Sequence, residues 1–159
     1  MHLKSLLRGA HAYLSPAAAL DGLSAIHAAS RPEGAPHSIA EIVAHMAFWQ
    51  EWFLDRCDGT AVPSPTSAAL GWPNVDNEDW DTVRERFEAG FRRALTIAED
   101  GSRLAEPIAP PIEMKFLATY TVGDALTHVA LHNGHHIGQV VTLRQLLGAW
   151  PPPAGSWTW

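Results

Sequence analysis

The chain has 159 residues, of which 47% are hydrophobic and 18% are charged, and its formal net charge is −6. This composition suits one globular domain with a hydrophobic core and excludes an intrinsically disordered chain. The acidic balance disfavours a nucleic-acid partner, and no apolar run approaches the roughly 18 residues that cross a membrane.

Cys57 is the only cysteine, so the chain has neither an internal disulfide nor a multi-cysteine zinc site. Its position at the end of a predicted helix, beside Asp58, does not favour a thiolate. The N-terminal apolar stretch is too short for a secretion signal, because Arg8 and His11 interrupt it. We therefore expect a cytoplasmic protein with a single domain over residues 1–159.

The first predicted helical segment covers residues 2–14, where apolar residues recur with helical spacing. Ser15 and Pro16 break this segment. The alanine-rich residues 17–29 are expected to continue it as helix after the break.

Residues 38–57 form the second predicted helix. Ser38, with Glu41 three positions later, is a capping box that marks the N-terminus. Asp58 and Gly59 end the segment.

Two more helices are predicted over residues 77–100 and 121–148. The first has acidic residues in its opening turn, where the helix dipole favours negative charge. The second begins at Thr121 with Asp124 as its acidic capping partner, and it stops at Gly148.

The connections 58–76 and 101–120 are long and rich in proline, and strand signals are weak. These features predict an all-α protein, a four-helix bundle with at least one long crossover. The Pro- and Trp-rich tail, residues 149–159, is expected to be extended, with Trp157 or Trp159 holding it to the surface.

Nine histidines are many for this length, and their spacing indicates a metal site. On a helical wheel at about 100° per residue, His132 and His136 lie about 40° apart. Both fall within the apolar stripe of their helix, which also contains Ala125, Val129, Val140, Leu143 and Leu147. An i, i+4 pair of inward histidines suits two ligands of one ion.

His45 faces inward as well, because Ile42, Trp49, Trp52 and Phe53 share its side of the second helix. A single histidine on an apolar face is usually a hydrogen-bonded core residue. For three inward histidines without buried carboxylate partners, it is harder to provide every ring nitrogen with a hydrogen bond. We therefore predict that His45, His132 and His136 bind one divalent metal ion, zinc or nickel first, with iron, cobalt and manganese as alternatives.

Three further polar residues lie near this stripe. His128, one turn before His132, is a candidate fourth ligand, second-shell group or proton shuttle. Gln139 is a candidate hydrogen-bond partner of a metal histidine, although a helix-packing role is equally compatible with its position. His135 lies nearer the edge of the stripe and is a weaker candidate.

The run HVALHNGHHIGQVVTLRQLLG, residues 128–148, resembles the last helix of the DinB/YfiT-like family of metal-dependent enzymes. The run SIAEIVAHMAFWQEWF, residues 38–53, resembles that family's second helix with its single metal histidine. The resemblance covers most of the chain. It implies the ligands His45, His132 and His136, a bundle in up-down-down-up order and a homodimer.

One position departs from the family pattern, because many members have Arg directly after the last metal histidine and Ile137 stands here. Functions in the family include S-transferases and isomerases that use low-molecular-weight thiols such as bacillithiol or mycothiol. The resemblance thus implies a thiol as cofactor or co-substrate, whereas it leaves the small-molecule substrate open.

Three functions are compatible with these residues. A metal-dependent S-transferase or hydrolase would use an open three-histidine site, with His128 moving protons. A non-catalytic metal or ligand binder, such as a stress-response protein, would fit the absence of an evident carboxylate base. An interaction scaffold with a vestigial site is the third.

Overall fold

The computed structural model describes residues 2–10, 12–110 and 113–155. Over these ranges regular secondary structure is helical, apart from one isolated bridge between Pro107 and Thr121, so the all-α prediction is confirmed. The α-helices are α1 (Leu3–Leu7), α2 (Pro16–Leu20), α3 (Ala25–Ala29), α4 (Ile39–Cys57), α5 (Trp80–Ile97) and α6 (Val122–Leu146). Three short 3-10 helices are η1 (Ala68–Gly71), η2 (Arg103–Ala105) and η3 (Lys115–Leu117).

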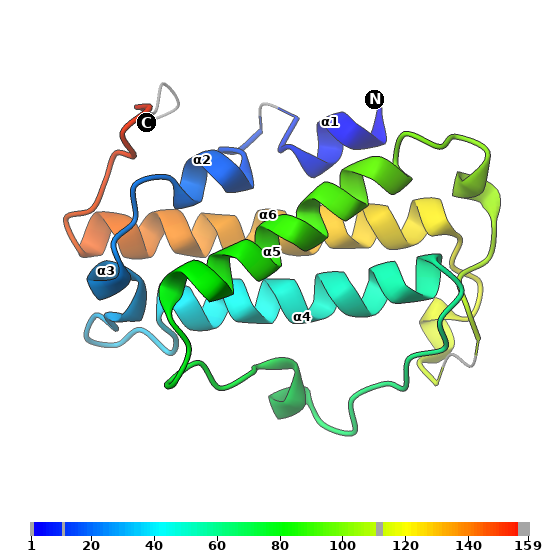
Figure 1. Cartoon of the computed structure of the whole chain (residues 1–159), viewed down its shortest axis with the longest axis horizontal. Helices are drawn as coiled ribbons and strands as arrows, with labels where there is room; N and C mark the ends of the chain where they lie inside the picture. Colours follow the sequence, from blue (N-terminus) through cyan, green and yellow to red (C-terminus); the bar gives the residue numbers. More distant parts are fainter. Residues whose placement is uncertain (1, 11, 111–112, 156–159) are drawn as a thin grey trace.

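The three long helices α4, α5 and α6 lie side by side, and α1 and α2 together occupy the fourth position of the bundle (Figure 1). The pair α1–α2 and α6 run one way, whereas α4 and α5 run the other way (Figure 1). The order is therefore up-down-down-up. Because α4 and α5 are parallel, residues 58–79 must return along the bundle as a long crossover.

The first helix of the bundle is shorter and more broken than predicted. Helix continues only to Leu7, since Gly9 has φ 93° and Ala10 has φ 47°, outside the right-handed helical region. The predicted segment 17–29 is divided in the same way, because Gly22 has φ 65° between α2 and α3. Each of the two predicted segments, 2–14 and 17–29, is thus interrupted by a left-handed turn.

The predicted starts of the two site-bearing helices are confirmed. Ser38 and Glu41 form a capping box at α4, and Thr121 and Asp124 form one at α6. The predicted helix 77–100 is shorter at both ends: Asp79 caps α5 through the backbone N–H of Thr82, and the helix ends at Ile97.

A buried amide pair fixes how α6 sits against the other long helices. Asn133 of α6 donates to Gln50 of α4 over 3.0 Å, and Gln50 donates to the carbonyl of Phe87 in α5 over 2.9 Å. Gly90 allows this contact, because a Cβ there would lie 2.4 Å from the Gln50 amide nitrogen. The rotation of α6 that turns its histidines toward α4 is set here.

Gly134 lets the segment before α2 approach α6 closely. A Cβ at this position would lie 2.9 Å from the ring of Tyr13, whose hydroxyl donates to the carbonyl of Ala130. The glycine within the histidine cluster therefore has a packing role.

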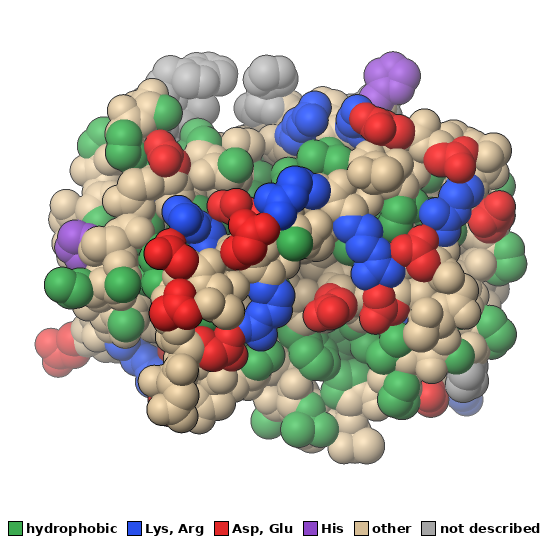
Figure 2. Space-filling view, in the orientation of Figure 1, with side chains coloured by type: hydrophobic (Ala, Val, Ile, Leu, Met, Phe, Trp, Pro, Cys, Tyr) green, Lys and Arg blue, Asp and Glu red, His purple; other side chains and the backbone are tan. Residues whose placement is uncertain are grey.

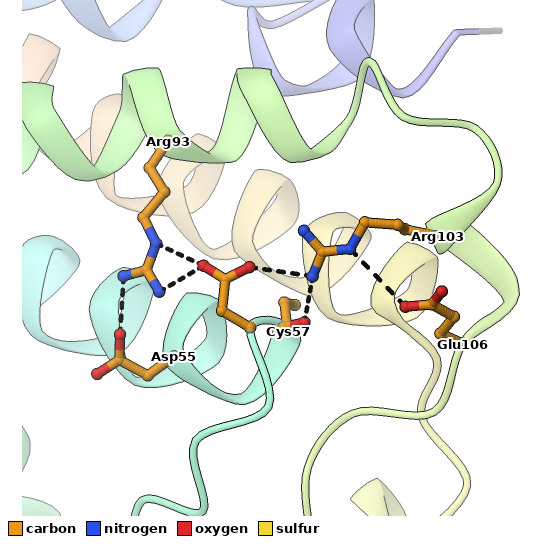
Figure 3. Close-up of polar contacts among 6 residues, drawn as sticks. Asp55, Cys57, Arg93, Arg103 and Glu106 are labelled. Carbon is orange, nitrogen blue, oxygen red and sulfur yellow. Dashed lines mark hydrogen bonds and ion pairs between the residues drawn. The ribbon is translucent and has the colours of Figure 1, made fainter.

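Ion pairs cover the outer side of α5, where acidic and basic side chains alternate (Figure 2). At the end of α4, Arg93 binds both Asp55 and Asp58, and Arg103 binds Asp58 in turn (Figure 3). Burial raises the pKa of Asp58, but the hydrogen bonds from the two arginines outweigh it and lower that pKa overall. This network joins α4, α5 and the start of the connection 101–120.

The C-terminal tail packs along the short helices as far as it is described. Pro152 is buried, and Pro153 lies against Gly22. Trp157 and Trp159, which were expected to hold the tail, lie outside the described residues. Among the helices in the described ranges, none has both the length and the apolarity to cross a membrane.

Candidate metal centre

The structure brings the three predicted ligands together. Each of the three histidines has one ring nitrogen that lies within 4.8 Å of the corresponding nitrogens of the other two. His45 comes from α4, and His132 and His136 come from α6. The Nε2 atoms of His45 and His132 are 3.2 Å apart. His45 and His136 are each 7% exposed and His132 is half-buried, so the cluster lies within the bundle with His132 on the side of the surface.

Two of the rings are oriented by a contact to their second nitrogen. Nδ1 of His45 lies 2.6 Å from the carbonyl of Gly71, which accepts only, so this nitrogen carries the proton and Nε2 keeps its lone pair. Nδ1 of His136 lies 2.7 Å from the side-chain oxygen of Gln139 and is oriented likewise. This arrangement is typical of metal-binding histidines, and it gives Gln139 the partner that the helical wheel suggested.

The crossover segment supplies an aromatic wall that the sequence did not indicate. Trp72 stacks on His45 at 3.8 Å between ring centroids and contacts His136 edge-on. Its other face stacks on His37, also at 3.8 Å. Gly71 ends the short helix η1 and Trp72 follows it, within a crossover that has no sequence periodicity, and only the closed fold shows that this segment returns to α4.

Burial keeps the three rings neutral. Together with the neighbouring imidazoles, it lowers the pKa of His45 to about 4 and that of His132 to about 3. Burial also lowers the pKa of His136, and the opposing hydrogen bond that its Nδ1–H donates to Gln139 does not cancel this effect. Neutral imidazole is the form that binds metal, so the cluster has its ligand form at neutral pH.

The donor set fits a divalent transition-metal ion. With Zn–N bonds of about 2.1 Å, a tetrahedral shell places nitrogen ligands about 3.4 Å apart. The 3.2 Å between His45 and His132 is close to that separation. Within the described residues the cluster holds three imidazoles and neither carboxylate nor thiolate, a set that zinc, nickel, cobalt and ferrous iron accept.

His128 lies beside the cluster and is not a member of it. Its ring packs on Phe53 at 4.6 Å between centroids, and its Nδ1 lies 3.3 Å from the hydroxyl of Tyr120. With His132 it lines a hollow of about 430 Å³ that opens on the surface. Burial lowers the pKa of His128 as well. The structure therefore favours a neighbour of the cluster over a fourth ligand.

The other candidate residues are also placed. His135 is exposed on α6, and its Nε2 lies 3.4 Å from the amide nitrogen of Gln139. Ile137 has no exposed surface and packs in the hydrophobic core, so its side chain does not face the cluster. Burial and Asp58 raise the pKa of the Cys57 thiol to about 12, which confirms that this cysteine is not an activated nucleophile.

The fold and the cluster together define a helical bundle with a histidine site for a divalent metal ion. The family model of the DinB superfamily matches residues 10–140 of the 159, so the chain belongs to the DinB superfamily. No curated protein matches the chain.

Proposed function

We propose that this protein is a metal-dependent enzyme whose His45, His132 and His136 hold one divalent ion, zinc or nickel first. The observation that supports it best is the convergence of three neutral imidazoles, two of them oriented through Nδ1. Three protein ligands are the usual set of a catalytic zinc site, which keeps a further position for water or substrate.

When bound, such an ion lowers the pKa of a thiol or water that it contacts and so supplies a nucleophile at neutral pH. The reaction class we propose is transfer of a low-molecular-weight thiol to a small-molecule electrophile, or hydrolysis. We propose that His128 accepts the proton, since burial lowers its pKa and favours the neutral ring, and since it lies one turn from His132 and lines the same hollow. Tyr120 orients its ring through Nδ1.

The experiment uses full-length protein purified without a metal-affinity tag. After the metal content is measured, the ion is removed with a chelator and zinc or nickel is restored. S-transfer is assayed with bacillithiol and mycothiol, and ester hydrolysis is assayed without thiol. Activity that requires the ion and disappears in His132→Ala supports the proposal. Equal activity in wild type and His132→Ala contradicts it.

A non-catalytic metal binder is the second candidate, and one observation favours it. The described residues of the cluster include no carboxylate that would act as a general base beside the ion. The His128→Ala variant separates the two candidates. If the protein is an enzyme, His128→Ala loses turnover and keeps its affinity for zinc. If the protein is a binder, neither wild type nor His128→Ala shows turnover in any assay, and the two bind zinc equally well.

A further inference from the structure

A second hollow borders the metal centre on the C-terminal side of α6. This groove, of about 510 Å³, lies between the residues that precede α4 and the outer side of α6. Pro36 and Ile42 form one wall, and Leu143 and Leu146 form the other. A concave, mainly apolar site of this size is typical of small-molecule binding.

Two residues of the groove connect to metal ligands, one by direct contact and the other through Trp72. Gln139 lines the groove and accepts from Nδ1 of His136. His37 lines it as well and stacks on Trp72, which stacks on His45. A molecule in the groove would therefore touch the side chain that orients His136 and the ring that packs on Trp72, the neighbour of His45.

The described lining of the groove includes neither lysine nor arginine, and Glu33 is its one carboxylate; the imidazoles of His37 and His135 also line it. An anionic group would find no permanent positive charge in the groove and would face the Glu33 carboxylate. An uncharged apolar molecule gives up little hydration free energy when it leaves water. In the groove it would also cover the exposed side chain of Leu146. The lining thus favours a neutral ligand.

We infer that this groove binds the apolar part of an uncharged small-molecule substrate of the metal centre. The inference rests on the proposed function, since it assigns the electrophile to this side of the cluster and the nucleophile to the His128 side. Gln139 is then a positioning residue that joins the occupied groove to His136.

The test uses metal-free full-length protein and the neutral fluorescent probe N-phenyl-1-naphthylamine. Its anionic counterpart, 1-anilinonaphthalene-8-sulfonate, has the same rings and adds the charge. We expect the neutral probe to bind at least tenfold more tightly. Equal binding of the two probes would overturn the inference about charge and with it the ligand class.

Two matched variants locate the probe. Thr142→Trp adds an indole inside the groove, whereas Thr96→Trp makes the same exchange at an exposed position of α5, outside the groove. We expect Thr142→Trp to weaken binding of the neutral probe at least tenfold and Thr96→Trp to change it less than twofold. Equal loss of probe affinity in the two variants would overturn the assignment of the probe to this groove. A lower molecular mass of Thr142→Trp than of wild type by light scattering would overturn it as well, because the groove would then be a contact between subunits.

A final measurement connects the groove to the ion. In cobalt-loaded protein, the neutral probe should change the visible absorption of Co²⁺, and Gln139→Leu should abolish this change while the probe still binds. An unchanged cobalt spectrum in wild type would overturn the link. Probe binding to metal-free protein and zinc binding without probe are separate readouts, so failure of the proposed function is distinguishable from failure of the groove.

Discussion

Each inward histidine of the cluster combines a depressed pKa with a free ring nitrogen. Burial provides the first property, and the partners at Nδ1 of His45 and His136 provide the second. Of these two partners, only Gln139 can be removed by a side-chain substitution, because Gly71 contributes its backbone carbonyl.

We expect Gln139→Leu to weaken zinc affinity by about 10–100-fold, the usual effect of removing such a partner. The ring of His136 would lose the contact that selects its tautomer. Isothermal titration calorimetry measures the affinity. His135→Leu is the control, because His135 is exposed and meets the His136 ring only edge-on, at 5.0 Å between centroids, while it contacts the amide nitrogen of Gln139. Equal losses in both variants would contradict a specific role of Gln139.

The depressed pKa values predict how the metal-free protein responds to acid. Both His45 and His132 have folded pKa values, about 4 and about 3, below the unfolded value near 6.5. The unfolded chain therefore binds more protons as pH falls below 6.5, and the free energy of unfolding decreases. Between pH 6.5 and 5, where carboxylates hardly titrate, we expect a loss on the order of 1 kcal/mol for each ring.

Urea unfolding at several pH values measures this loss. His132→Gln should reduce it, while His2→Gln, which changes an exposed histidine, should leave it as in wild type. A pH-independent unfolding free energy over this window would show that the rings are not desolvated.

The ligands could be predicted from sequence, and their surroundings could not. The spacing of His132 and His136 and the apolar neighbours of His45 define inward faces of regular helices, so a helical wheel locates them. Trp72 and His37 belong to loops, where no period relates a residue to a face. Their positions depend on how the chain closes.

At the scale of the elements, two glycines of α6 illustrate opposite uses of the same residue. Gly134 lies against Tyr13, whereas a Cβ at Gly138 would meet nothing within 4 Å. The first glycine is needed for packing, and the second carries only the entropic cost of glycine in a helix.

We expect Gly134→Ala to destabilise the protein by about 1–3 kcal/mol, because the added methyl group must displace a packed ring. Gly138→Ala should instead stabilise it by about 0.5–1 kcal/mol. Urea denaturation compares both variants with wild type. In a Tyr13→Ala background, the penalty at Gly134 should largely disappear, and a penalty of unchanged size there would exclude the ring as its cause.

Capped, periodic helices could be predicted at this scale, and the broken first helix could not. Ser38 and Thr121 mark their helix starts by local chemistry. The left-handed turn at Ala10 has no such local signal. Buried Arg144 supports the short helices instead, donating to the carbonyls of Ala19 and Asp21, far away in sequence.

At the scale of the whole molecule, we propose a homodimer, as the family resemblance implies. The chain has seven tryptophans, more than one small core readily buries, and aromatic residues are favoured at interfaces. The described tryptophans are nevertheless buried or half-buried within one chain, so their number is not evidence for a second subunit. Light scattering after size-exclusion chromatography should give twice the 17.3 kDa chain mass. A monomer mass throughout the micromolar range would contradict the dimer.

The measurement that tests the central claim most directly is calorimetric titration of metal-free protein with zinc at pH 7.5. The three converging imidazoles predict one ion per chain in wild type, and little or no binding in His45→Ala, His132→Ala or His136→Ala. His128→Ala should keep the stoichiometry of wild type, because that ring packs on Phe53 outside the cluster. Undiminished binding of one ion in His132→Ala would show that the ion binds elsewhere and would contradict the account.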